Sequence, residues 1–150
     1  MKICLAFSAG GHFTEMRMIS EAFHGHNISY ATIKAKTTEN LSNVYYLKNT
    51  AGATKVHMIF NMFIVMIQSL IIILKDKPTV LVSTGADVTI PLCFFGKIFG
   101  AKIIFIESIC RVKDISPTGK IIYLISDLFF VQWENLVKKY DKAIYRGRVL

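Results

Sequence analysis

The sequence has few acidic residues and no cluster of basic ones. Its 150 residues include 10 Asp and Glu against 18 Lys and Arg, a formal net charge of +8 that favours an anionic partner. The basic residues are dispersed and the aromatic residues lie mainly in apolar runs, whereas nucleic-acid surfaces combine clustered charge with stacking rings. We therefore expect no nucleic-acid binding, and we expect phosphorylated substrates or anionic membrane head groups as partners.

Cysteine is also scarce, with Cys4, Cys93 and Cys110 the three present. An odd number in apolar surroundings, without metal-ligand spacing, predicts reduced, buried thiols and no metal site. No signal peptide is visible, because Met1 and Lys2 lead into only five apolar residues before a glycine turn. We therefore expect the chain in the cytoplasm.

Linkers, internal repeats and low-complexity segments are absent, so residues 1–150 are expected to form one domain. Short apolar runs bounded by turn residues alternate with segments of helical periodicity. The expected strands are 2–8, 27–33, 44–47, 79–83, 102–106 and 128–132, with a last one at the start of 143–150, and the expected helices are 13–23, 57–74, 88–99, 118–125 and 133–140. Because the main strands are apolar along their length, this order predicts an α/β fold, a Rossmann-like parallel sheet with helices on both faces.

The most apolar segment, residues 57–74, carries only a few polar side chains. At about 1.5 Å per residue it marginally reaches across a bilayer core of about 30 Å, and strands of one sheet before and after it argue against a membrane-spanning path. Asn61, Gln68 and Lys75 recur every seven residues as a thin polar stripe. One face is therefore expected to cover the sheet, with the other in contact with the core, a partner subunit or lipid.

Residues 8–12, Ser-Ala-Gly-Gly-His, separate the first strand from the first helix. Two glycines let the backbone approach a ligand, and the first N–H groups and dipole of the helix would face it, which predicts an anion seat. The loop lacks the third glycine of the dinucleotide fingerprint and the Gly-Lys-Ser/Thr of a P-loop, and Lys34 rather than an acidic residue follows the second strand. Taken alone, the loop also fits a tight turn without a ligand.

Two further loops follow expected strands in the same way. In a parallel sheet, ligands gather at the carboxyl ends of the strands, where the loops 8–12, 83–87 and 107–111 would meet. Each carries small or polar residues suited to a phosphate, a sugar hydroxyl or a catalytic proton. Asp87 is expected to cap the helix that follows it. The three loops together predict one binding crevice.

Five sequence strings occur in the order seen in a particular two-subunit glycosyltransferase. They are SAGGHFTEM (8–16), STGADVTIP (83–91), GAKIIFIESICRV (100–112), TGKIIY (118–123) and DLFFVQW (127–133). Over nearly its whole length the chain resembles the membrane-associated, acceptor-binding subunit of that enzyme, which adds the second N-acetylglucosamine to the dolichol-linked precursor. Bacterial relatives act in capsule and exopolysaccharide synthesis, and Phe13, where eukaryotic members usually have Thr, favours that role.

More remotely, the pattern is similar to the N-terminal half of the GT-B transferase that adds N-acetylglucosamine to lipid I. The resemblance implies that this chain is such an acceptor half, acting in polysaccharide biosynthesis on a polyprenyl-diphosphate-linked saccharide. A separate donor-binding subunit would supply the UDP-sugar site, so this chain would bind no cofactor itself and have little activity alone.

The resemblance also implies peripheral attachment to the cytoplasmic face of the membrane. Eukaryotic members carry an N-terminal membrane helix that is not found here, so the helix 57–74 and basic loops are expected to provide the contact. Two alternatives stay open. One is a non-catalytic membrane scaffold for a separate transferase, and the other is a stand-alone nucleotide-binding Rossmann enzyme.

Under the same resemblance, the acceptor diphosphate would bind the N–H groups of Gly10 and Gly11, helped by Arg111. His12 is a candidate general base, because imidazole titrates near neutrality, or it only bonds the loop backbone. Glu107 is the other candidate base, a group that orients the acceptor sugar, or a cap of the following turn. The remaining residues expected to contact the acceptor or its phosphates are Ser8, Thr84, Gly85 and Ser108.

Overall fold

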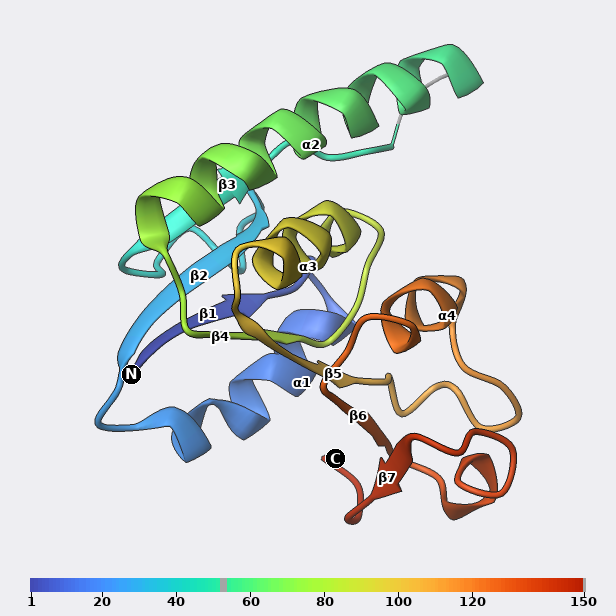
Figure 1. Ribbon diagram of the computed structural model, residues 1–150. Coiled ribbons are helices and arrows are strands. Elements are labelled where there is room, and N and C mark those ends of the chain that lie inside the picture. Colours follow the sequence, from blue (N-terminus) through green and yellow to red (C-terminus); the bar gives the residue numbers. More distant parts are fainter. Residues whose placement is uncertain (52–53, 150) are drawn as a thin grey trace.

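In the computed structural model, which describes residues 1–51 and 54–149, seven parallel strands form one sheet (Figure 1). The strand order is β3-β2-β1-β4-β5-β6-β7. The strands are β1 (Lys2–Ala6), β2 (Asn27–Ile33), β3 (Val44–Leu47), β4 (Val80–Ser83), β5 (Lys102–Ile106), β6 (Leu128–Val131) and β7 (Ala143–Tyr145). Because all run in the same direction, their carboxyl ends share one edge, which we call the carboxyl edge.

Helices cover both faces of the sheet, as predicted (Figure 1). The helices are α1 (Gly11–Ile19), α2 (Lys55–Asp76), α3 (Thr89–Ile98) and α4 (Pro117–Tyr123), with two 3₁₀ turns, η1 (Ser20–Phe23) and η2 (Glu134–Leu136). Successive residues of a strand point to opposite faces. Accordingly Cys4 packs in the core beneath α2, α3 and α4, while Ile3 and Leu5 pack with α1. The Rossmann-like α/β prediction is confirmed.

Three local predictions are wrong. The expected helix 133–140 is only the turn η2, because the indole N–H of Trp133 donates to Ile109 O at 2.6 Å and ties this connection to a neighbouring loop. The expected helix 13–23 is α-helical only to Ile19, where the Ser20 hydroxyl donates to Arg17 O. Asp87 does not cap α3; its carboxylate accepts from the Thr50 hydroxyl and from its neighbour's N–H.

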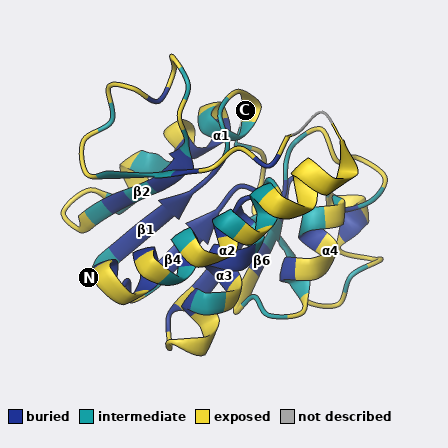
Figure 2. Cartoon of the chain, turned by 90° about the horizontal axis from the view of Figure 1, so that it is seen from above, coloured by how far each residue is buried: buried dark blue, intermediate teal, exposed yellow. Residues whose placement is uncertain are grey.

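Helix α2 lies over the sheet with one face and exposes the other (Figure 2). It is apolar and long enough to cross a membrane by length and composition alone, but it connects β3 to β4 of one sheet, as expected. Two residues of the predicted polar stripe, Asn61 and Gln68, face the protein, whereas Lys75 is exposed. Asn61 Nδ2 donates to Ala51 O at 3.1 Å, and Gln68 Oε1 accepts from Lys48 N at 2.8 Å, so both bind the segment that follows β3.

We expect the core to depend on the stacked rings of Phe105 and Phe129, whose centroids lie 5.0 Å apart in β5 and β6. Both side chains are buried, so Phe105→Ala should lower the free energy of unfolding by about 3–5 kcal/mol. Phe94→Ala removes the same atoms from a half-exposed site on α3 and should cost less than about 1 kcal/mol. Urea unfolding measures both. Equal losses would contradict the assigned core.

Candidate functional site

A hollow of about 530 Å³ opens at the carboxyl edge of the sheet, between the loops after β1, β4 and β5. Its lining residues are Gly11, His12, Ala86, Glu107, Ser108, Cys110, Arg111, Ser116, Pro117 and Thr118. The structure therefore brings together five residues singled out from the sequence, which are Gly11, His12, Glu107, Ser108 and Arg111. Ser8, Gly10, Thr84 and Gly85 lie in the adjoining loops but do not line this hollow.

The N-terminus of α1 faces the hollow at Gly11. Gly10 precedes the helix with φ +82°, a backbone conformation that favours glycine. Over the described residues, no side chain caps the helix, and no acidic residue occurs in its first turn. The first N–H groups and the positive end of the helix dipole therefore meet no carboxylate within the first turn of α1, which favours a bound anion there.

His12 is held in place by the loop after β4. The Thr84 hydroxyl donates to His12 O at 2.9 Å, so Thr84 joins the loop after β4 to the first turn of α1. Gly85 has φ +113°, and a Cβ there would come within 3.0 Å of His12 Cε1. The ring atom Nδ1 is buried and has no partner in the described part of the chain. Because Nδ1 is enclosed, Nε2 is the ring nitrogen through which His12 could contact a ligand in the hollow.

Glu107 directly follows β5 and is only 1 % exposed. Its Oε1 accepts from Ser108 N at 3.0 Å, and its Oε2 accepts from Ser116 N and Oγ at 2.8 and 3.0 Å. Burial raises the pKa of this carboxyl, and the bonds to Ser116 and Ser108 partly oppose that rise. A Cβ on Gly119 would overlap Glu107 Oε2, so glycine at that position lets α4 approach the carboxylate.

Reasoning from the sequence missed Glu15, which lies on α1 and is 2 % exposed. Its Oε1 accepts from Ser108 Oγ at 3.0 Å and from Ile109 N at 2.9 Å, and lies 3.5 Å from Gln132 Nε2. In the sequence pattern, Glu15 is one of several polar residues of an amphipathic helix. No signal in a single sequence separates it from them, because its partners lie more than 90 residues away.

The prediction that all three thiols are buried is wrong for Cys110, which is exposed in the turn after β5. That turn closes with Arg111 N donating to Ser108 O at 3.0 Å. Cys4 and Cys93 are buried, and burial raises the pKa of the Cys4 thiol to about 12.

Among the described residues, no group of three or more His, Cys, Asp or Glu side chains is arranged to hold a metal ion.

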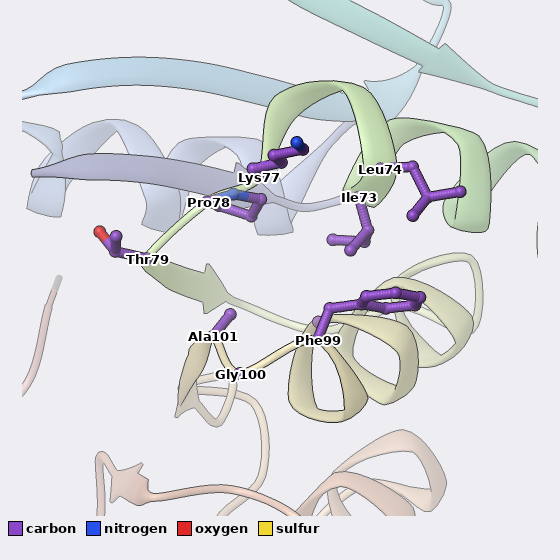
Figure 3. A pocket seen from close by; sticks show the side chains of 9 residues that line it. Ile73, Leu74, Lys77, Pro78, Thr79, Phe99, Gly100 and Ala101 are labelled. Atoms are coloured by element: carbon purple, nitrogen blue, oxygen red, sulfur yellow. The ribbon is translucent and has the colours of Figure 1, made fainter.

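A second pocket, of about 330 Å³, lies at the opposite edge of the sheet (Figure 3). It is lined where α2 ends and β4 and β5 begin, by Lys77, Pro78, Thr79 and Ala101 among others. Figure 3 shows mainly aliphatic and aromatic side chains there. It contains none of the residues singled out from the sequence, and it lies away from the carboxyl ends where ligands of parallel sheets gather.

Comparison with solved structures gives the class of the fold. The chain superposes on MurG of Acinetobacter baumannii with a TM-score of 0.78 at 10% sequence identity, over 99% of this chain and 45% of that one. UDP-N-acetylglucosamine 2-epimerase of Rickettsia bellii gives 0.77 at 14% identity, with the same coverage. The chain thus spans less than half the length of these proteins. Its fold is the Rossmann-like α/β domain found in GT-B glycosyltransferases and related epimerases.

The chain belongs to the family described as "Oligosaccharide biosynthesis protein Alg14 like", whose sequence model matches residues 3–149. Curated relatives are named UDP-N-acetylglucosamine transferase subunit ALG14. The mouse relative is 27% identical, with 100% of this chain and 83% of that protein aligned. The Candida albicans relative is 29% identical, with 97% and 77% aligned. The resemblance inferred from the five strings is confirmed.

We expect Gly85→Ala to displace the His12 ring, because the added Cβ meets Cε1 and the backbone has positive φ. The strain alone should cost roughly 1–2 kcal/mol. Gly25→Ala is a matched control, since Gly25 has φ +83° and nothing within 4 Å of an added Cβ. Both variants should lose similar stability, but only Gly85→Ala should shift the His12 ring signals in NMR spectra. An unchanged His12 environment would contradict the packing described.

Thiol labelling tests the hollow directly. In the native chain, a maleimide at neutral pH should modify Cys110 rapidly and leave Cys4 and Cys93 unmodified until the protein unfolds. A ligand in the hollow should slow labelling of Cys110, which lines it. Mass spectrometry identifies the modified residue. Fast labelling of Cys4 or Cys93 would show that the core opens or packs differently.

Proposed function

We propose that this chain is the acceptor-binding and membrane-recruiting subunit of a two-chain glycosyltransferase. The enzyme transfers a sugar from a UDP-sugar to a polyprenyl-diphosphate-linked saccharide in polysaccharide biosynthesis. The observation that carries the proposal is the hollow, in which the uncapped N-terminus of α1, His12 and Arg111 come together. Membership of a family whose curated relatives are named transferase subunits supports it.

The acceptor diphosphate binds the N–H groups at the start of α1, at Gly11, which lines the hollow, and at Gly10 immediately before it. The chemistry suits it, because unpaired N–H groups and the helix dipole favour negative charge there. Arg111 supplies a full positive charge on the opposite side, with a planar group that forms paired hydrogen bonds to phosphate oxygens. Ser8, Thr84, Gly85 and Ser108 shape and support this seat.

His12 acts as the general base. Its Nε2 takes the proton of the acceptor hydroxyl as the oxygen attacks the anomeric carbon, and the UDP leaves with the electron pair of the broken bond. Glu107, the other candidate, already accepts three hydrogen bonds from Ser108 and Ser116. That favours a supporting role, in which Glu107 holds the loop after β5 and the start of α4 around the acceptor sugar.

A separate subunit supplies the UDP-sugar site, and this chain binds no cofactor of its own. The division is supported by the curated relatives, which are named subunits of a transferase. The carboxyl edge with its hollow would then face the donor-binding subunit, which leaves the active cleft between the two chains.

The membrane contact is the apolar face formed by exposed side chains of α2, α3 and α4 and by Leu124, which follows α4. Its members are Val56, Met58, Ile59, Phe60, Phe63, Met66, Ile67, Ile71, Leu74, Phe94, Ile98, Ile121 and Leu124. An apolar surface this large is uncommon on a monomer that contacts only water. The N-terminal turns of α2 extend past the sheet at its carboxyl edge (Figure 1), so the same contact would hold the hollow close to the lipid surface. This corresponds to peripheral association with the cytoplasmic face.

Sugar transfer with the donor-binding subunit present tests the mechanism. With UDP-N-acetylglucosamine and a polyprenyl-diphosphate-linked acceptor, His12→Ala should lower kcat by about 100-fold or more, because it removes the base. His26→Ala, at an exposed histidine beyond the end of α1, should leave turnover near the wild-type value. Near-normal turnover in His12→Ala would remove His12 from the mechanism.

Vesicle binding tests the membrane contact. Ile59 and Phe63 are 71% and 59% exposed on α2, and replacing both by Glu should weaken co-sedimentation with phosphatidylglycerol-containing vesicles by about tenfold or more. Met18→Glu is the matched control, because Met18 is 53% exposed on α1, across the sheet. Equal weakening by Met18→Glu, or none in the double variant, would contradict the assignment.

A further inference from the structure

Glu15 joins α1, on one side of the hollow, to the turn after β5 on the other side. It lies on α1, three residues after His12, and therefore moves with the helix that begins at Gly11. Its Oε1 accepts from the Ser108 hydroxyl and from Ile109 N, both in the turn after β5. Glu15 itself does not line the hollow, so its influence on a bound anion must pass through the turn that it holds.

Burying the Glu15 carboxylate costs free energy unless it accepts these hydrogen bonds. The side chain is 2% exposed, its Oε2 has no partner in the described part of the chain, and no described Lys or Arg forms an ion pair with it. Burying a carboxylate without a counter-charge is unfavourable, and hydrogen bonds from N–H and O–H groups are what offset it. Bonds to a charged acceptor are also shorter and stronger than those to a neutral one.

The turn that Glu15 holds places Arg111. Arg111 N donates to Ser108 O at 3.0 Å, so the bonded residues 108 and 109 fix the start of a single tight turn that ends at the arginine. Two further bonds hold the same turn from behind, with Trp133 Nε1 donating to Ile109 O and Gln132 Nε2 donating to Glu107 O. Among the described hydrogen bonds, only those accepted by Glu15 link this turn to α1.

We infer that Glu15 is a positioning residue that holds the Arg111 guanidinium at a fixed separation from the N–H groups of Gly10 and Gly11, so that both sides grip one diphosphate. The inference rests on the proposed function, because it presumes that the hollow binds that group. Loss of the charge on Glu15 leaves Arg111 and the N–H groups of Gly10 and Gly11 in place, but Arg111 is then held less firmly relative to those N–H groups.

A double-mutant cycle with inorganic pyrophosphate as the probe tests this. Calorimetry measures pyrophosphate affinity in the wild type, Glu15→Gln, Arg111→Ala and the double variant, with urea unfolding to show that each is folded. Glu15→Gln keeps the shape and one acceptor oxygen, and should weaken binding about fivefold. In the Arg111→Ala background the same change should have less than a twofold effect, because the arginine through which it acts is gone. Glu21→Gln is the matched control, on an exposed glutamate of η1, and should change nothing.

Each outcome decides a separate question. Wild-type binding with equal effects of Glu15→Gln in both backgrounds would overturn the inference, since Glu15 would then support the fold and not the arginine. Wild-type binding unaffected by Glu15→Gln would overturn it as well. If the wild type bound no pyrophosphate, the proposed function would fail and the inference with it. Should Glu15→Gln unfold, Ser108→Ala removes one of the two donors to Glu15 and must show the same dependence on Arg111.

Discussion

The parallel direction of the strands is the constraint on which the rest of the structure depends. It brings the ends of β1, β4 and β5 to one edge, although about 80 residues of chain separate the end of β1 from the end of β4. Short strands with apolar side chains on both faces can be stable only when helices cover both sides, and α1 to α4 do so. The hollow is therefore a consequence of the sheet, with its chemistry set by the residues that follow each strand.

Two buried carboxylates then fix the geometry of that edge. Glu107 accepts hydrogen bonds that bring the start of α4 against the end of β5, and Glu15 joins the turn after β5 to α1. Neither is neutralised by an ion pair among the described contacts, so backbone and hydroxyl donors hold them. The two carboxylates thus hold the loops in position. The groups of the hollow that could contact an anion are the N–H groups at the start of α1, the His12 imidazole and the Arg111 guanidinium.

The sequence was sufficient for the sheet because apolar strands and helical periodicity are local signals. It also indicated three loops that meet, since that follows from the parallel order. It failed where distant contacts override local pattern. The local pattern predicts a helix from Trp133, but the indole of this residue donates a hydrogen bond to Ile109 O, 24 residues away. The apolar run before Cys110 predicts a buried thiol, but that run ends at the edge of the sheet and the thiol is exposed. Glu15 could not be distinguished from a solvated helix residue, since its role depends on Ser108 and Ile109.

In the proposed function, the exposed apolar side chains of α2, α3 and α4 contact lipid and the hollow at the carboxyl edge binds the diphosphate, which suits a ligand with an apolar chain and a charged head. The central claim is that this head occupies the hollow. Hydrogen–deuterium exchange of the chain with a short-chain polyprenyl diphosphate sugar measures it most directly. The account predicts slowed exchange at residues 10–13 and 107–111. Protection confined to the pocket of Figure 3, or none at all, would contradict it.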